Sequence, residues 1–268
     1  MNGTVKAIIA GAVIFGVGLG FILLAVGLNG WDFPAKVDWE PKTYEYDGDI
    51  RDIYIDFSAG QLEIKKYDGD TIKVEYSHSE RFTTDCKVLG TRLQISTSSV
   101  RWFNSFMWFN TIPKTTLYIP ANQTVNMNVE VNAGQVTVSE GNYGDVFVEL
   151  NAGTLDVYDM QCLDCEMVVN AGTLNVRSIS CSKFSGNLSA GALNVSGLDC
   201  NNIKVTVSAG TANLTILGDK EDYTIVASVS AGRCNVHNQI GREDPVKHIK
   251  IDVSAGTANI RFDYPVTQ

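Results

Sequence analysis

The sequence predicts an all-β fold, a single-stack β-solenoid with coils of about 19 residues, preceded by one N-terminal transmembrane helix. The first observation behind this prediction is a phrase, Ser-Ala-Gly or Asn-Ala-Gly, that recurs every 19 residues from Asn132 to Ser208. Fixed self-similarity near this period is typical of solenoids. The second is period-two apolar patterning on both sides of the phrase, which is typical of strands with one buried face. The third is an uncharged N-terminal run.

That run is predicted to cross a membrane. Residues Ala7 to Leu28 are 22 residues without a charge, and a helix of this length spans about 33 Å, enough for a bilayer core. It exceeds the usual hydrophobic region of a signal peptide, although cleavage after Gly27 remains an alternative. Lys6 precedes the run and Asp32 follows it, which places the N-terminus in the cytoplasm and the remainder outside. The expected segments are a cytoplasmic stub (1–6), a transmembrane anchor (7–29) and a juxtamembrane linker (30–44).

Small residues recur at every fourth position of the anchor, at Ala12, Gly16 and Gly20. This spacing lets two helices approach closely and predicts a homodimer through the membrane helix. The alternative is that glycine is simply common in membrane helices.

Each solenoid coil is expected to be a strand, an Ala-Gly corner, a second strand and a wider turn. Apolar residues alternate before the phrase, as at Val129 and Val131, and again after it, as at Val136 and Val138. Glycine suits the corner because it adopts positive φ and leaves room for a tight bend. Seven such coils follow one another in residues 127–264, with 265–268 as a tail. The predicted corner glycines are Gly60, Gly134, Gly153, Gly172, Gly191, Gly210, Gly232 and Gly256.

A polar column is predicted on the outside of the second strands. The fifth position after the start of the phrase lies between two buried residues, so its side chain should face outward and form an amide ladder along the stack. A row of asparagines that binds a sugar or a surface is the alternative. The column comprises Asp156, Asn175, Asn194, Asn213, Asn235 and Asn259.

Residues 45–126 are expected to form less regular β coils, because the Ser58 copy of the phrase carries the same pattern there. Their unusual feature is an aromatic loop at residues 100–112 without clean alternation. Large aromatic side chains there predict either a hydrophobic cap that closes the solenoid or a surface that contacts a partner or lipid. The residues of this possible contact are Trp102, Phe103, Phe106, Trp108 and Phe109.

Five of the six cysteines, all except Cys86, occupy positions expected to lie in the core, and the cysteines are expected to be thiols. Cys162, Cys181 and Cys200 are 19 residues apart and should form one column at the wide turn, whereas Cys165 takes an ordinary buried position. The Cys162-x-x-Cys165 pair lacks the βαβ context of a thioredoxin-like site, and a zinc site needs further ligands that converge on it. No metal or cofactor is therefore expected.

Composition argues against nucleic acid as a partner. The net charge is −9, and a chain this acidic without a basic stripe is repelled by phosphate backbones. No Ser-His-Asp order or Gly-x-Ser-x-Gly motif is present. Glu130 and Glu149 share one outward column where a carboxylate pair would act on a glycan, but a solvated edge is the expectation. The sequence thus predicts a protein that is not an enzyme.

The repeat resembles the DUF4097 family of adhesin-like bacterial envelope proteins. The matching stretches are IRDIYIDFSAGQLEI, DTIKVEYS, TTLYIP, the serial Ala-Gly turns and YTIVASVSAGRCNV, together covering roughly residues 44–262. The resemblance implies a single-pass envelope protein of Firmicutes with a β-solenoid exterior and no catalytic residues to carry over. It favours a surface module that binds a wall polymer, a host surface or an envelope protein. The alternatives are a sensory or regulatory component of the envelope-stress response, a polymerising scaffold and a glycan-acting enzyme; Pro265, just after the last coil, argues against stacking at that end.

Overall fold

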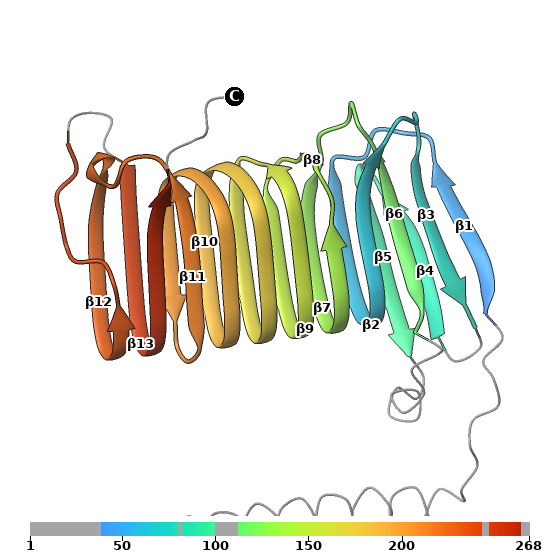
Figure 1. Ribbon diagram of the computed structural model, residues 1–268. Coiled ribbons are helices and arrows are strands. Elements are labelled where there is room, and N and C mark those ends of the chain that lie inside the picture. Colours follow the sequence, from blue (N-terminus) through green and yellow to red (C-terminus); the bar gives the residue numbers. More distant parts are fainter. Residues whose placement is uncertain (1–38, 80–81, 100–111, 243–246, 264–268) are drawn as a thin grey trace, which may run out of the picture. The chain divides into compact units, whose positions relative to one another are not determined.

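The computed structural model describes residues 39–79, 82–99, 112–242 and 247–263, and these are almost wholly β-structure, as predicted (Figure 1). The one helical element among them is a single 3-10 turn at Lys220–Asp222. The strands are β1 (Glu40–Tyr46), β2 (Asp52–Tyr67), β3 (Ile72–His78), β4 (Phe82–Leu89), β5 (Arg92–Ser99), β6 (Lys114–Pro120), β7 (Asn126–Val138), β8 (Gly141–Asn142), β9 (Val146–Gln161), β10 (Asp164–Val207), β11 (Thr211–Leu217), β12 (Tyr223–Cys234) and β13 (Lys247–Asp263).

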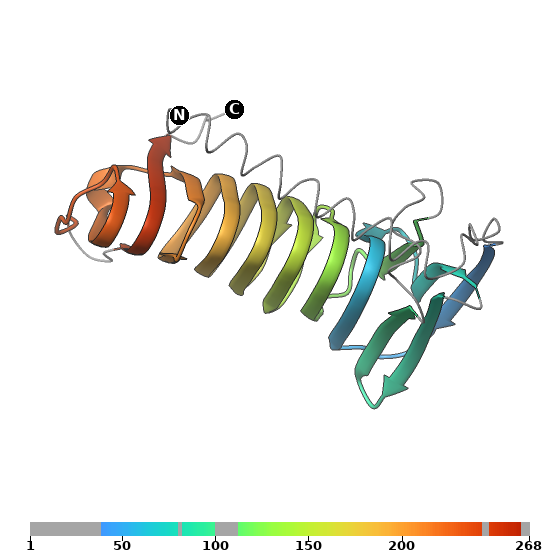
Figure 2. The same ribbon diagram turned by 90° about the horizontal axis from the view of Figure 1, so that it is seen from below.

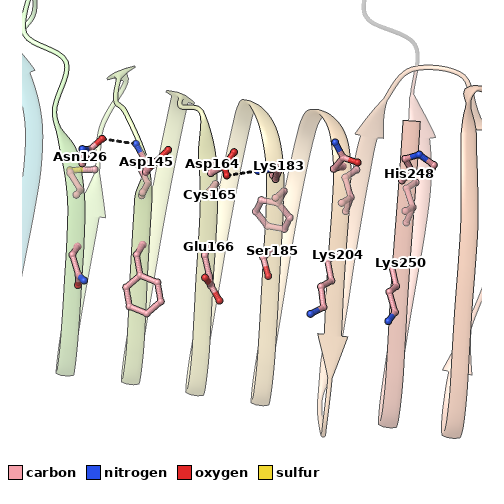
Figure 3. Close-up of a pocket in the computed structure, with 18 of the residues that line it drawn as sticks. Asn126, Asp145, Asp164, Cys165, Glu166, Lys183, Ser185, Lys204, His248 and Lys250 are labelled. Carbon is pink, nitrogen blue, oxygen red and sulfur yellow. Dashed lines mark hydrogen bonds and ion pairs between the residues drawn. The ribbon is translucent and has the colours of Figure 1, made fainter. Parts of the chain in front are cut away.

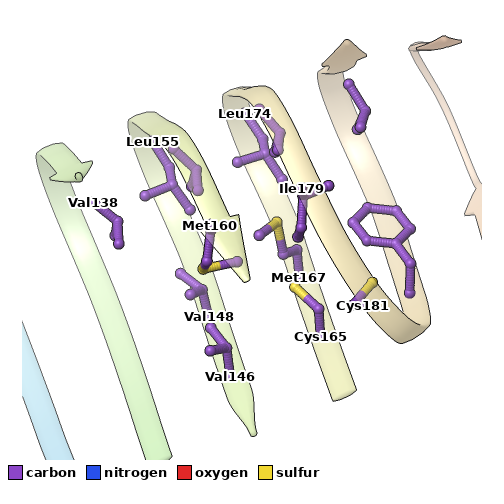
Figure 4. Close-up of a cluster of buried hydrophobic side chains, with 14 of the residues drawn as sticks. Val138, Val146, Val148, Leu155, Met160, Cys165, Met167, Leu174, Ile179 and Cys181 are labelled. Carbon is purple, nitrogen blue, oxygen red and sulfur yellow. The ribbon is translucent and has the colours of Figure 1, made fainter. Parts of the chain in front are cut away.

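Successive coils stack in parallel and in register (Figures 1 and 2). In β7 and β9, for example, Val131 lies opposite Leu150, and Val136 lies opposite Leu155. Because every coil places its apolar residues at the same positions, each coil buries them against the next, and one hydrophobic core runs through the stack (Figure 4).

All eight predicted corner glycines have positive φ. They also stack on one another, which leaves no space for a side chain. A Cβ on Gly153 would overlap the carbonyl oxygen of Gly134, and a Cβ on Gly172 would overlap that of Gly153. The repeat therefore needs glycine at the corner for two reasons, the backbone conformation and the close approach of the next coil.

The wide turn contains a second column with positive φ, which the sequence pattern did not reveal. It comprises Asp159, Ser178 and Gly197, which are spaced 19 residues apart. The register shifts between Ser196 and Leu198, so Gly197 is an extra residue in a β-bulge. The bulge bends the chain after the second strand of each coil, so that Met160, Ile179 and Leu198, which follow it, enter the core.

At the N-terminal end, an irregular coil lies outside β2 although it follows β2 in the sequence. β5 pairs in parallel with the first half of β2, and β6 pairs in parallel with its second half. β4 and β3 then add to this coil in antiparallel fashion, and β1 pairs with β3 from within the segment expected as a linker.

At the C-terminal end, the coils do not stack in the order of the chain. β13 pairs with β10 and β11 on one side and with β12 on the other. The last coil of the sequence therefore lies between two coils that precede it in the sequence. The reason is length. β12 ends at Cys234 with only the start of a second strand, whereas β13 continues to Asp263 and covers both strands of the preceding coil. The coil formed by β13 therefore buries more surface than β12 would in the position next to β10 and β11.

The free end of the solenoid is consequently β12, and the position of Pro265 after β13 does not protect it. Part of this edge is covered by the chain that follows. The backbone groups of Ile225 and Gln239 exchange two hydrogen bonds of 2.9 and 3.0 Å, and the side chain of Asn238 accepts one from the amide of Ala227. Val236 is buried beneath this segment, whereas Val229 is 41% exposed.

Three sets of predicted residues lie outside the described part of the chain. They are the anchor at residues 7–29, its small residues Ala12, Gly16 and Gly20, and the aromatic residues Trp102, Phe103, Phe106, Trp108 and Phe109. Within the residues that the structure describes, no helix has the length and apolar character needed to cross a membrane.

Candidate functional site

A groove of about 1110 Å³ runs along the first strands of the coils (Figure 3). We call it the lateral groove. Its lining residues come from eight successive strand segments of the stack and from Arg92 of the irregular coil. Those used below are Asp52, Tyr54, Asn126, Asp145, Phe147, Asp164, Glu166, Lys183, Asn202, Lys204, Val226, His248 and Lys250.

The parallel register arranges these side chains in straight columns. In each first strand, alternate residues enter the core, as Ile203 and Ile249 do, and their neighbours project into the groove. Lys204 of β10 lies opposite Lys250 of β13, and Asn202 lies opposite His248. Neighbouring coils are about 4.8 Å apart, so side chains from several coils form one continuous surface.

Charge is unevenly distributed along the groove. Asp145, Asp164 and Glu166 form an acidic section in its middle, and Lys183, Lys204 and Lys250 form a basic section nearer β12 (Figure 3). Nζ of Lys183 lies 2.8 Å from Oδ2 of Asp164 where the two sections meet. Both side chains are about half exposed or more, so this pair contributes little to stability and can exchange partners.

Lys204 and Lys250 are an adjacent pair of like charges. Nζ of Lys250 lies 3.5 Å from Oδ2 of Asp252, whereas Lys204 has no carboxylate within ion-pairing distance among the described residues. Like charges directly opposite each other destabilise a sheet. An anion bound between the two ammonium groups would relieve this repulsion, and the side chains of Asn202 and His248 flank the position.

Two aromatic rings lie on the other half of the groove. Tyr54 and Phe147 are partly buried and occupy the same column as Lys204. Burial and, to a smaller extent, the neighbouring carboxylate of Glu130 raise the pKa of Tyr54 above its usual value. Partly exposed ring faces bind the apolar faces of sugars or other flat groups.

The carboxylates considered for glycan hydrolysis lie beside this groove. Glu130 and Glu149 are opposite each other on β7 and β9 and are partly buried. Oε1 of Glu149 accepts a hydrogen bond of 3.0 Å from the side-chain amide of Asn170. The amide holds this carboxylate on the surface beside the groove.

The asparagine column forms the amide ladder that the repeat predicts. The side chain of Asn194 donates to Asn175 over 3.0 Å and accepts from Asn213 over 2.8 Å. Asn235 departs from the ladder, because in the end coil it bonds the backbone of Ile260. A second ladder, which the sequence interpretation missed, joins the first residues of the phrase, Asn132, Asn151 and Asn170.

The fold defines the protein as a single-stack β-solenoid with an open groove along one face. The chain belongs to the DUF4097 (Toastrack) family, whose model matches residues 50–264. No curated protein matches it.

One solved structure with the same fold and two with a weaker likeness were found. A candidate adhesin from Bacteroides fragilis has a TM-score of 0.55 at 12% identity, over 86% of this chain and all of that one. A candidate cell adhesion protein from Clostridium sporogenes has a TM-score of 0.38 at 14% identity, over 84% of this chain and all of that one. A candidate lipid-binding protein from Parabacteroides distasonis has a TM-score of 0.41 at 13% identity, over 85% and 97% of the two chains.

Proposed function

We propose that the protein is a membrane-anchored, extracytoplasmic binding module of the bacterial envelope, adhesin-like and non-enzymatic. Its ligand is a linear envelope glycopolymer that carries both acidic and amine groups. The observation that carries this proposal is the Lys204–Lys250 pair, two exposed like charges on adjacent coils beside a section of opposite charge. The anchor is the uncharged run from Ala7 to Leu28.

The shape of the groove supports a linear ligand. From Asp52 to His248 the groove crosses six coil-to-coil steps, or about 29 Å. It is open along its length, so a chain longer than the groove can lie in it and continue beyond both ends. Small-molecule sites, by contrast, enclose most of the ligand surface.

The charge of the groove supports a ligand with both kinds of group. A uniformly anionic polymer would be repelled by Asp145 and Glu166, whereas a uniformly cationic one would be repelled by Lys204 and Lys250. A glycopolymer with alternating phosphate or carboxylate and amine substituents matches both sections. Its sugar rings would lie against Tyr54 and Phe147.

Co-sedimentation of the full-length chain with isolated cell walls tests this function. We expect the detergent-solubilised protein to sediment with intact walls and to remain in the supernatant after acid extraction of the anionic polymers. Equal sedimentation with intact and extracted walls would contradict the proposal.

A second candidate function, end-to-end association, is favoured by the uncovered edge of β12. Val226, Val229 and Ile240 are 50%, 41% and 90% exposed, and they are three of the six large exposed hydrophobic side chains in the described residues. An open strand edge with apolar side chains is a template for pairing with another chain. Sedimentation velocity of the full-length protein with and without Val229→Lys tests this; a concentration-dependent oligomer that the substitution dissociates is expected, and identical profiles would exclude it.

A further inference from the structure

Asn128 lines the lateral groove between two aromatic side chains. It lies opposite Tyr54 of β2 on one side and opposite Phe147 of β9 on the other. All three residues line the groove from equivalent positions of adjacent coils. The two aromatic residues are two coil steps apart, or about 9.6 Å, and the side chain between them is shorter than either. The groove therefore has a recess at Asn128 with an aromatic side chain on each side.

The side-chain carbonyl of Asn128 lacks the hydrogen bond that a buried acceptor normally makes. Its Oδ1 is buried, but no donor reaches it from the described residues. Asn126, two residues earlier in β7, shows the usual arrangement. Its amide donates to Oδ1 of Asp52 over 3.1 Å, and its carbonyl accepts from the backbone amide of Asp145 over 3.0 Å (Figure 3). Because buried polar atoms are almost always paired, the carbonyl of Asn128 points to a donor on a bound group.

The neighbours of Asn128 explain why the protein supplies no donor. Where asparagines stack, the amide of one coil donates to the carbonyl of the next, as Asn194 does to Asn175. Aromatic residues replace both neighbours of Asn128, and the ring of Phe147 has no donor. Asn128 as a whole is only partly buried, and the last side-chain torsion of asparagine is broad. Rotation of the amide can therefore turn its carbonyl toward the groove without a change of the backbone.

The recess lies in a strongly acidic part of the molecule. Five carboxylates surround its three side chains, and none of them forms an ion pair among the described residues. These are Asp52, Asp56, Glu130, Asp145 and Glu149. Arg92 lies opposite Asp52 at one corner, without a salt bridge between them. The local charge thus favours a cationic group in the recess and opposes an anionic one.

We propose that this recess is a subsite for a sugar with a free primary amine, a protonated 2-amino-2-deoxyhexose, and that it discriminates against the N-acetylated sugar. The proposal rests on the binding function proposed above and specifies its amine-bearing sugar. The apolar face of the sugar packs on Phe147 or Tyr54, and the ammonium donates a hydrogen bond to Oδ1 of Asn128.

Each part of the recess recognises the free amine. An aromatic ring attracts a cation that lies within about 6 Å of its centroid, and the five carboxylates add to this attraction. Acetylation removes the positive charge and so loses both effects. A quaternary ammonium group keeps the charge but has no N–H to donate to Asn128.

Oligosaccharides without anionic groups test this subsite in the full-length protein in detergent. The probes are a β-1,4-linked glucosamine hexamer and its fully N-acetylated form, titrated calorimetrically at pH 6 and low ionic strength. We expect the glucosamine hexamer to bind at least about 10-fold more tightly, because the charge-assisted hydrogen bond and the cation–π contact require the free amine. Added salt should reduce this preference. Equal affinities would overturn the proposal, as would displacement of the hexamer by tetramethylammonium as readily as by methylammonium.

Asn128→Leu removes the acceptor at nearly constant volume. It should weaken binding of the glucosamine hexamer about 10-fold and hardly alter binding of the acetylated hexamer. Because the lost carbonyl has no partner in the protein, the melting temperature should not fall. Asn142→Leu, at an exposed position of β8 outside the groove, is the matched control and should bind as the unchanged protein does. An undiminished preference for the free amine in Asn128→Leu would overturn the role of Asn128.

The subsite and the envelope-binding function can fail separately. The hexamers carry no anion, so their binding does not involve the Lys204–Lys250 pair. If the protein sediments with intact walls but shows no preference between the hexamers, the binding function stands and the subsite is wrong. If the preference holds but sedimentation is the same with extracted walls, the subsite stands and the anionic wall polymer is not the ligand. The hexamer comparison is made within the unchanged protein, so it does not depend on the folding of any variant.

Discussion

The side-chain amide of Asn259 donates a hydrogen bond of 2.8 Å to Oδ1 of Asn213, although 46 residues separate the two in the sequence. Asn235 comes between them in the sequence but lies in the outer coil, where it bonds Ile260. The ladder therefore records the order of the coils in space. It shows that the last coil of the chain is inserted between two earlier ones.

This order predicts which asparagines are energetically coupled. In double-mutant cycles to Ala, Asn213 and Asn259 should show a coupling energy of about 0.5–1.5 kcal/mol, the net value of one intramolecular hydrogen bond. Asn213 and Asn235 should be additive. Chemical denaturation of the four variants in each cycle provides the measurement, and coupling of Asn213 to Asn235 in place of Asn259 would mean that the coils stack in chain order.

Substitutions of glycine can separate the two reasons for glycine at the corner, which are close packing between coils and positive φ. Gly153→Ala should destabilise by about 3 kcal/mol or more, because it combines a disfavoured φ with overlap on Gly134. Gly90→Ala is the matched control, since Gly90 also has positive φ but a Cβ there meets nothing within 4 Å. It should cost about 1–2 kcal/mol. Equal losses in thermal denaturation would show that the corner is not closely packed.

The bulge column predicts a stabilising substitution. Ser178 has φ of 59°, a conformation that its neighbour in the column, Gly197, adopts without steric cost. Ser178→Gly should therefore stabilise the protein by up to about 1 kcal/mol, less the extra entropy that glycine gives the unfolded chain. A rise in the melting temperature is expected, whereas Ser180→Gly, two residues further along the chain, should lower it.

Lys66 predicts a pH dependence of stability. Burial lowers the pKa of Lys66 to about 8, below the value of about 10.4 expected in the unfolded chain. Between these two pKa values the unfolded state binds more protons than the folded state, so the free energy of unfolding rises with pH. The destabilisation caused by burying the charged Lys66 is fully present below pH 8. Relative to Lys66→Met, the unchanged protein should gain stability from pH 8 to 10.5. A constant difference across this range would show that Lys66 is not desolvated.

The sequence was sufficient for the regular part of the fold, because each feature there repeats. The alternation around Val131 and Val136, the corner glycines and the column from Asn175 to Asn213 all follow from one 19-residue pattern. The ends were harder to predict, since they break the pattern. The outermost coil is the one with the shorter second strand, and β12 has little of a second strand after the corner. Local periodicity does not show how much pairing surface each coil offers.

The lateral groove was missed for a related reason. Glu130 and Glu149 belong to the outward column nearest the repeated phrase. The groove is lined by columns that lie further from the phrase in the sequence. Those columns could have been read from the alignment of coils, which places Lys204 and Lys250 at equivalent positions. Their positions directly opposite each other, however, require the insertion of β13 beside β10.

The measurement that tests the binding function most directly is the dissociation constant for a purified wall glycopolymer bearing phosphate and amine groups. We expect Lys204→Gln/Lys250→Gln to weaken binding by the full-length protein about 10- to 100-fold, because charge-assisted hydrogen bonds to the anionic groups are lost. Lys87→Gln, an exposed lysine on β4 outside the groove, is the control and should bind as the unchanged protein does. An unchanged dissociation constant for the double variant, with an unaltered melting temperature, would contradict the proposed site.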